Sequence, residues 1–113
     1  MRADERKRID NFIKEYLLLD IRIKIAKAKI IHARYNNNEI TVNKQQDMVH
    51  QLEQLKLDIE SNIDNKYLGY LKIFKMDTDE ATQVLSISKA NLFKLKKEIR
   101  EEFYDMVIKG DKC

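Results

Sequence analysis

Residues 9–33 read IDNFIKEYLLLDIRIKIAKAKIIHA, and apolar side chains recur in this stretch at alternating steps of three and four. Side chains three and four positions apart share one face of an α-helix, so the spacing predicts a single helix from about residue 4 to residue 35. Further apolar residues widen this face, which favours burial against two neighbouring helices. The regular positions are Ile9, Phe12, Tyr16, Leu19, Ile23, Ala26, Ile30 and Ala33.

A second helix is predicted from about residue 43 to residue 63. Three consecutive asparagines at 36–38 precede it, and asparagine accepts the left-handed and turn conformations that end helices. Asn43 followed by Gln46 resembles an N-cap and its reciprocal partner, so residues 36–43 are expected to form a loop. The apolar stripe of the second helix consists of Met48, Leu52, Leu55, Ile59 and Ile63.

The two predicted helices carry opposite charges. Between Arg22 and Arg34 every charged residue of the first helix is basic, whereas acids outnumber bases in the second. Opposite charges on consecutive amphipathic helices favour antiparallel pairing, so residues 1–64 are expected to form a long, coiled-coil-like helical hairpin. Two helices cannot bury such broad faces alone, and we therefore expect a homodimer or a higher homo-oligomer. The residues expected in the hairpin core or the dimer interface are Ile9, Tyr16, Ile23, Ile30, Leu52 and Ile59.

Composition supports an all-α fold. The 113 residues include no proline and only two glycines, and 36% are charged. Sandwiches and barrels need frequent turns, which such a composition does not supply. The single cysteine, Cys113, excludes an internal disulfide. No apolar stretch approaches the ~20 residues of a membrane span and no signal peptide is visible, so a cytoplasmic protein without a membrane partner is expected.

The C-terminal part, residues 65–109, has the layout of a helix-turn-helix. A short helix is expected at 66–74, and its continuity with the preceding helix stays open. Asp77 followed by Glu80 predicts a capped helix that ends at Leu85. Ser86-Ile87-Ser88 is a tight connection in which Ser88 caps a last helix from Lys89 to about Val107. Residues 110–113 are expected to form a disordered tail.

The last predicted helix presents side chains suited to DNA. Its inward residues are Leu92 and Leu95, and its outward residues are Lys89, Asn91, Lys94 and Lys97. A recognition helix uses exposed residues near its N-terminus on base edges and phosphates. Asparagine suits adenine, and lysine suits guanine or phosphate, so these four residues are the candidate DNA-binding residues.

Residues 70–99, YLKIFKMDTDEATQVLSISKANLFKLKKEI, resemble the region-4 helix-turn-helix of sigma factors. The whole plan, a helical hairpin followed by this unit, is similar to small phage-encoded transcription regulators such as the RinA- and ArpU-like activators of late genes. The resemblance implies a regulator that binds double-stranded DNA. The chain departs from the usual pattern by a short segment between Phe74 and Glu80, and by Ser86 where a turn glycine is usual.

A different class of function is a protein-interaction module that modulates RNA polymerase or another regulator without contacting DNA. Enzymatic and metal-dependent functions find no support in the residues. His32 and His50 have no partner at metal-ligand spacing, and the two glycines cannot form a phosphate-binding loop. We therefore expect no catalytic residue, no metal and no cofactor.

Overall fold

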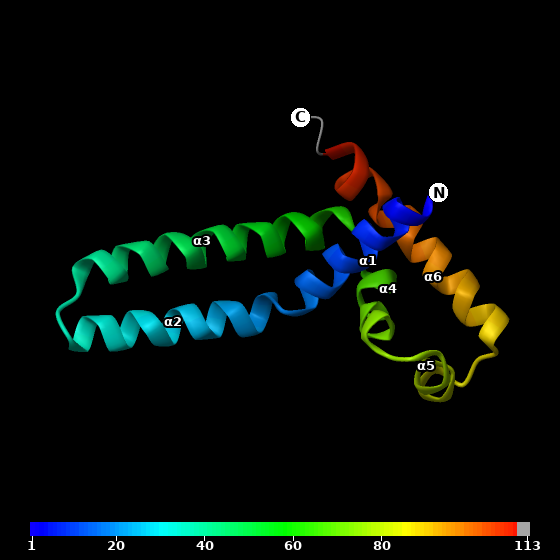
Figure 1. Ribbon diagram of the computed structural model, residues 1–113, viewed down its shortest axis with the longest axis horizontal. Helices are drawn as coiled ribbons and strands as arrows, with labels where there is room; N and C mark the ends of the chain where they lie inside the picture. Colours follow the sequence, from blue (N-terminus) through cyan, green and yellow to red (C-terminus); the bar gives the residue numbers. More distant parts are fainter. Residues whose placement is uncertain (111–113) are drawn as a thin grey trace. The chain divides into compact units, whose positions relative to one another are not determined.

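The computed structural model describes residues 1–110, and the prediction of an all-α fold is confirmed for them (Figure 1). The predicted tail at 110–113 lies outside the described residues apart from Gly110. The chain divides into two compact units. One comprises residues 18–62, and the other combines residues 1–17 with the part of the chain that begins at Ile63.

The unit of residues 18–62 is an antiparallel hairpin of α2 (Leu19–Tyr35) and α3 (Glu39–Asn62). Its buried core consists of Ile23, Ala26, Ile30 and Val49, with Val42 and Leu52 packed against it. Farther from the loop, Lys56 of α3 donates a hydrogen bond of 2.7 Å to Asp20 of α2. This bond raises the pKa of Lys56. The predicted antiparallel pairing is therefore observed. This cross-helix ion pair has the opposite sense to the predicted one, because its acid lies on α2 and its base on α3.

The loop of the hairpin is shorter than predicted. Asn37 adopts a left-handed conformation with φ of 56°, and the backbone N–H of Asn38 donates to the Ala33 carbonyl at 2.8 Å. The side chain of Asn38 then accepts a hydrogen bond of 3.1 Å from the Thr41 backbone N–H. Because Asn38 satisfies a free amide of the first turn, α3 begins at Glu39, and the prediction of a loop to residue 43 capped by Asn43 is wrong.

The predicted helix of residues 4–35 is two helices. α1 (Ala3–Leu17) ends one residue before Leu18, and α2 begins one residue after it. α1 belongs to the unit that contains the C-terminal helices, where it packs against η1, α6 and η2. The boundary predicted at residue 64 therefore differs from the observed units, and Ile9 and Tyr16 lie outside the hairpin. Ile9 is fully buried.

The rest of this second unit is a series of short elements and one longer helix. They are α4 (Asn65–Leu68), the 3₁₀ helix η1 (Leu71–Lys75), α5 (Thr78–Leu85), α6 (Lys89–Tyr104) and the π-helical turn η2 (Asp105–Lys109). Asp64 caps α4 by accepting a hydrogen bond of 3.0 Å from the Lys66 backbone N–H. The region expected to form one helix at 66–74 is therefore separate from α3 and divided in two. Its apolar residues Leu71, Ile73 and Phe74 are buried.

Candidate nucleic-acid interface

The connection between α5 and α6 is a tight left-handed turn. Ser86 has φ of 55° and ψ of 44°, and the Ile87 backbone N–H donates to the Thr82 carbonyl at 3.1 Å. This bond, together with one from the Ser86 N–H to the Gln83 carbonyl, closes the end of α5. Ala81 is fully buried on α5, which packs against α6. α5 and α6 are therefore two packed helices joined by a tight turn at the predicted position.

Both predicted side-chain caps are present. Asp77 accepts a hydrogen bond of 2.8 Å from the Glu80 backbone N–H at the start of α5. Ser88 accepts one of 3.2 Å from the Asn91 backbone N–H at the start of α6. Each cap satisfies a backbone donor that a helix terminus otherwise leaves free. The start of α6, where the candidate DNA-binding residues lie, is thereby fixed.

α6 separates its apolar and polar residues by face. Leu92, Ile99 and Phe103 are fully buried, while Leu95 is half-buried. The four candidate DNA-binding residues, Lys89, Asn91, Lys94 and Lys97, are all exposed on the first three turns. Lys89 makes an exposed ion pair with Asp79 of α5 at 3.8 Å. The first half of α6 therefore presents polar and basic side chains on an ordered helix.

Two other cations of α6 face inward instead. Arg100 forms a two-pronged pair with the Asp10 carboxylate of α1, with N–O distances of 2.7 and 2.9 Å. Lys96 and Arg100 also lie over the Phe74 ring, at 5.6 and 5.5 Å from its centre. Burial, followed by the charge of Arg100, lowers the pKa of Lys96. These two cations hold α6 to α1 and η1, so the basic run of the sequence is only partly available to a ligand.

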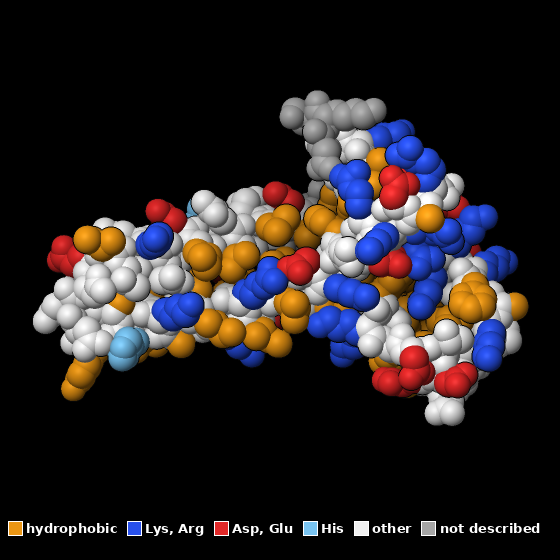
Figure 2. Space-filling view, in the orientation of Figure 1, with side chains coloured by type: hydrophobic (Ala, Val, Ile, Leu, Met, Phe, Trp, Pro, Cys, Tyr) orange, Lys and Arg blue, Asp and Glu red, His pale blue; other side chains and the backbone are white. Residues whose placement is uncertain are grey.

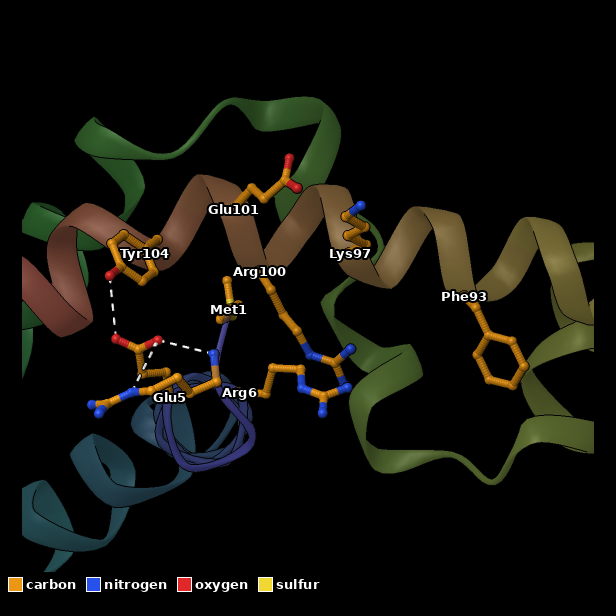
Figure 3. A pocket seen from close by; sticks show the side chains of 9 residues that line it. Met1, Glu5, Arg6, Phe93, Lys97, Arg100, Glu101 and Tyr104 are labelled. Atoms are coloured by element: carbon orange, nitrogen blue, oxygen red, sulfur yellow. Dashed lines mark hydrogen bonds and ion pairs between the residues drawn. The ribbon is translucent and has the colours of Figure 1, made fainter.

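An open groove of about 880 Å³ lies beside α6 (Figure 3). Arg6 of α1 and Arg100 of α6 point toward one another in it. Of the predicted site residues, only Lys97 lines this groove. Its lining comprises Met1, Arg2, Glu5, Arg6, Phe93, Lys97, Arg100, Glu101 and Tyr104. This groove contains more cations than carboxylates, and it has two aromatic rings, those of Phe93 and Tyr104.

Glu5, the acid that α1 contributes to this groove, already has partners. Glu5 accepts hydrogen bonds from the Arg2 backbone N–H at 3.0 Å and from the Tyr104 hydroxyl at 3.2 Å. The backbone bond is the main cause of a lowered pKa of Glu5, and the Tyr104 bond and the Arg2 charge add to it. By contrast, neither Arg6 nor Lys97 forms an ion pair within residues 1–110. Figure 2 shows further Lys and Arg side chains gathered over this unit.

The sequence does not reveal the contribution of α1 to the groove, because its spacing predicts one hairpin helix over residues 4–35. A signal was present, since Arg2, Arg6, Lys7 and Arg8 make the start of the chain strongly basic. The residues predicted for the hairpin core or dimer interface are divided between the units. Ile23, Ile30 and Ile59 are buried and Leu52 is half-buried in the hairpin unit, whereas Ile9 and the half-buried Tyr16 belong to α1.

Within residues 1–110, no three His, Cys, Asp or Glu side chains form a group that could hold a metal ion. No described helix has both the length and the apolar character needed to cross a membrane. The chain matches no protein-family model, no curated protein and no solved structure.

Proposed function

We propose that the unit formed by residues 1–17 and 63–110 binds double-stranded DNA, and that the protein is a transcription regulator. The observation that carries this proposal is the first half of α6. A left-handed turn and the Ser88 cap fix it, and it exposes Lys89, Asn91, Lys94 and Lys97. A helix presented in this way fits the major groove, where side chains near its start reach base edges. The resemblance to small phage-encoded activators of late genes supports a regulatory role.

The exposed residues have distinct roles in this proposal. Asn91 lies in the first turn and recognises a base, with adenine as its best partner. Lys94 and Lys97 contact phosphates or guanine. Lys89 exchanges its exposed pair with Asp79 for a phosphate at little cost, because such surface pairs contribute little to stability. Arg6 of α1, together with Arg2 just before this helix, extends the contact along the DNA backbone.

The test is binding of the full chain to random-sequence duplex DNA, followed by fluorescence anisotropy over a range of salt concentrations. Wild-type affinity should fall steeply with salt, because bound cations release the counterions of the phosphates. Lys94→Ala/Lys97→Ala should weaken binding to all sequences and reduce the slope by about 0.9 for each phosphate that the variant no longer neutralises. The matched control is Lys24→Ala/Lys27→Ala, which removes two exposed lysines from α2 instead. An equal decrease of the slope in both variants would contradict the assignment of α6.

Asn91→Ala separates sequence recognition from general affinity. On a site selected from a random library, this variant should lose about 1–3 kcal/mol of binding free energy. On unselected DNA it should bind as wild type does, because Asn91 carries no charge. Equal losses on both DNAs would show that Asn91 does not read a base.

A second candidate function is a protein-interaction module that acts on RNA polymerase or another regulator. The observation in its favour is the exposure of two apolar side chains of the helix-turn-helix, Val84 and Phe93. Exposed aromatic residues are enriched in protein interfaces. A wild-type chain that is folded but shows no salt-dependent DNA binding would favour this function over the first.

A further inference from the structure

The hairpin unit exposes apolar side chains that its own core does not use. Ile25 of α2 is 51% exposed, and Met48 and Leu55 of α3 are 45% and 41% exposed. Figure 2 shows hydrophobic side chains exposed along this unit. Met48 and Leu55 are seven residues apart, so they lie on the same side of α3, two turns from one another. The hairpin therefore has a second apolar stripe in addition to the buried one.

The three residues lie on one side of the hairpin. Two surface grooves lie between α2 and α3 on the other side of the hairpin, and Lys27 lines both of them. Because successive helical residues are separated by about 100°, Lys27 and Ile25 lie on opposite flanks of the buried stripe of α2. Glu53, which lines a groove, and Leu55 are likewise on opposite flanks of α3. Ile25, Met48 and Leu55 thus lie on one side of the hairpin, which we call the free face, whereas the exposed Ile31 and Leu57 lie on the other side, in the grooves.

We propose that the free face binds the free face of a second copy of this chain, so that two hairpins form a four-helix bundle in which α2 of each copy packs against α3 of the other. The charges of α2 and α3 favour a second copy of the chain as the binding partner of the free face. Between Arg22 and Arg34 every charged residue of α2 is basic, while acids outnumber bases on α3. The complement of a basic helix with an apolar stripe is an acidic helix with an apolar stripe, and α3 of a second copy has both properties.

The same charges select the symmetry of the pair. A two-fold axis perpendicular to the helices would place α2 against α2 and oppose two basic surfaces. A two-fold axis parallel to the helices places α2 against α3 in antiparallel orientation, with both hairpin loops at the same end. Such a closed two-fold pair is the commonest arrangement of soluble oligomers.

The parallel axis also determines which residues meet. Asp20 is level with Lys56 along the hairpin, because their side chains are joined by a hydrogen bond of 2.7 Å. Moving nine residues toward the loop on each helix makes Lys29 level with Asp47. A parallel two-fold axis preserves height, so Lys29 of one copy lies level with Asp47 of the second copy. This pair gives the proposal a test that does not depend on apolar burial.

The first experiment measures the mass of the full chain in solution by sedimentation. The wild type should have twice the 13.5 kDa mass of one chain. Leu55→Glu should raise the dissociation constant about a hundredfold or more, because a charge replaces a central apolar contact. The matched control is Leu57→Glu on the same helix, since Leu57 is 61% exposed and lines a groove on the opposite side. Ile25→Glu and Ile31→Glu form the equivalent pair on α2.

The outcomes separate clearly. Dissociation by Leu55→Glu and Ile25→Glu, with Leu57→Glu and Ile31→Glu still dimeric, supports the free face. A monomeric wild type, or equal effects of test and control variants, overturns it. Circular dichroism should show that each variant keeps the wild-type helical content, because all four side chains are exposed in one copy. Mass does not depend on DNA, so this proposal and the proposed DNA binding can fail separately.

The second experiment exchanges the charges of the predicted pair. Lys29→Asp should weaken the dimer several-fold by opposing Asp47 of the second copy, and Lys29→Asp/Asp47→Lys should restore it. If α2 instead packed against α2, Lys29→Asp would relieve repulsion and strengthen the dimer. A stronger dimer, or no rescue in the double variant, would overturn the arrangement of α2 against α3.

Discussion

Two non-glycine residues in the described part of the chain, Asn37 and Ser86, have a positive φ, and each ends a helix. Asparagine tolerates the left-handed region because its side chain forms local hydrogen bonds, whereas serine gains less there. Ser86 is therefore the more strained of the two. Its conformation redirects the chain between α5 and α6, so local strain at one residue sets the direction of the proposed recognition helix.

Ser86→Gly should leave the free energy of unfolding unchanged or raise it by up to about 1 kcal/mol, because glycine adopts a positive φ without strain. Urea denaturation of the full chain measures this difference. Ser86→Val is the opposing variant and should destabilise the protein, since a β-branched residue is poorly tolerated in this region. A clear loss of stability in Ser86→Gly would mean that the serine hydroxyl has a role at the turn.

At the scale of elements, the position of α1 decides the composition of the candidate interface. Phe12 meets Phe103 of α6 edge to face, with ring centres 6.0 Å apart. Asp10 pairs with Arg100, and both side chains are largely shielded, with 27% and 19% of their surfaces exposed. These contacts join the first and last helices of the chain. They bring Arg2 and Arg6 to the groove beside α6.

Asp10→Ala should lower the free energy of unfolding by about 1–3 kcal/mol, because it leaves the half-buried Arg100 without its carboxylate. The control is Asp105→Ala, which removes the exposed pair with Lys109 and should cost less than about 0.5 kcal/mol. Thermal and urea denaturation compare the two variants. Similar costs at both sites would mean that the Asp10–Arg100 pair does not hold α1 to α6.

The hydrogen bonds that Glu5 accepts, first from the Arg2 backbone N–H and then from the Tyr104 hydroxyl, predict a dependence on pH. The pKa of Glu5 is lowered from its usual 4.5 in the folded state. A lowered folded pKa contributes stability above the unfolded pKa, and this contribution is lost as the pH falls through the folded pKa. Glu5→Gln should therefore be less stable than wild type at neutral pH, and the two should converge in acid. Glu101→Gln, in the same groove, is the control, and an identical pH profile for both variants would contradict the prediction.

At the scale of the whole molecule, the two proposed activities belong to different compact units. DNA binding is assigned to residues 1–17 and 63–110, and self-association to residues 18–62. Linking two DNA-binding units raises the apparent affinity without any new interaction, because the second binding event becomes intramolecular. The two units should therefore be separable by mutation and coupled in their effect on DNA.

Lys94→Ala/Lys97→Ala should bind DNA weakly and keep the dimeric mass. Leu55→Glu should be monomeric and should lose apparent affinity for DNA that carries two sites, while its affinity for a single site stays at the wild-type value. Sedimentation and anisotropy on the same samples measure both properties. Loss of single-site binding in Leu55→Glu would show that the hairpin itself takes part in DNA recognition.

The local features of this protein follow from the sequence alone. Asp77 and Ser88 cap α5 and α6 as predicted, because a cap depends on residues within three positions of one another. The all-α class and the exposure of Lys89, Asn91, Lys94 and Lys97 also follow from composition and helical spacing. The hairpin loop shows the limit of this reasoning, since Asn43 was the predicted cap of α3 and the structure uses Asn38 instead.

Tertiary structure alone decided where α1 belongs. Its apolar stripe continues in phase through Leu19 into α2, so periodicity predicts one helix and cannot reveal which surface each half covers. That choice depends on contacts with residues some ninety positions away, such as Asp10 with Arg100 and Phe12 with Phe103. An apolar stripe indicates that one face of a helix will be buried. The surface that buries it is determined by shape and charge in the folded chain. For that reason, Arg2 and Arg6 entered the candidate interface only when the fold was known.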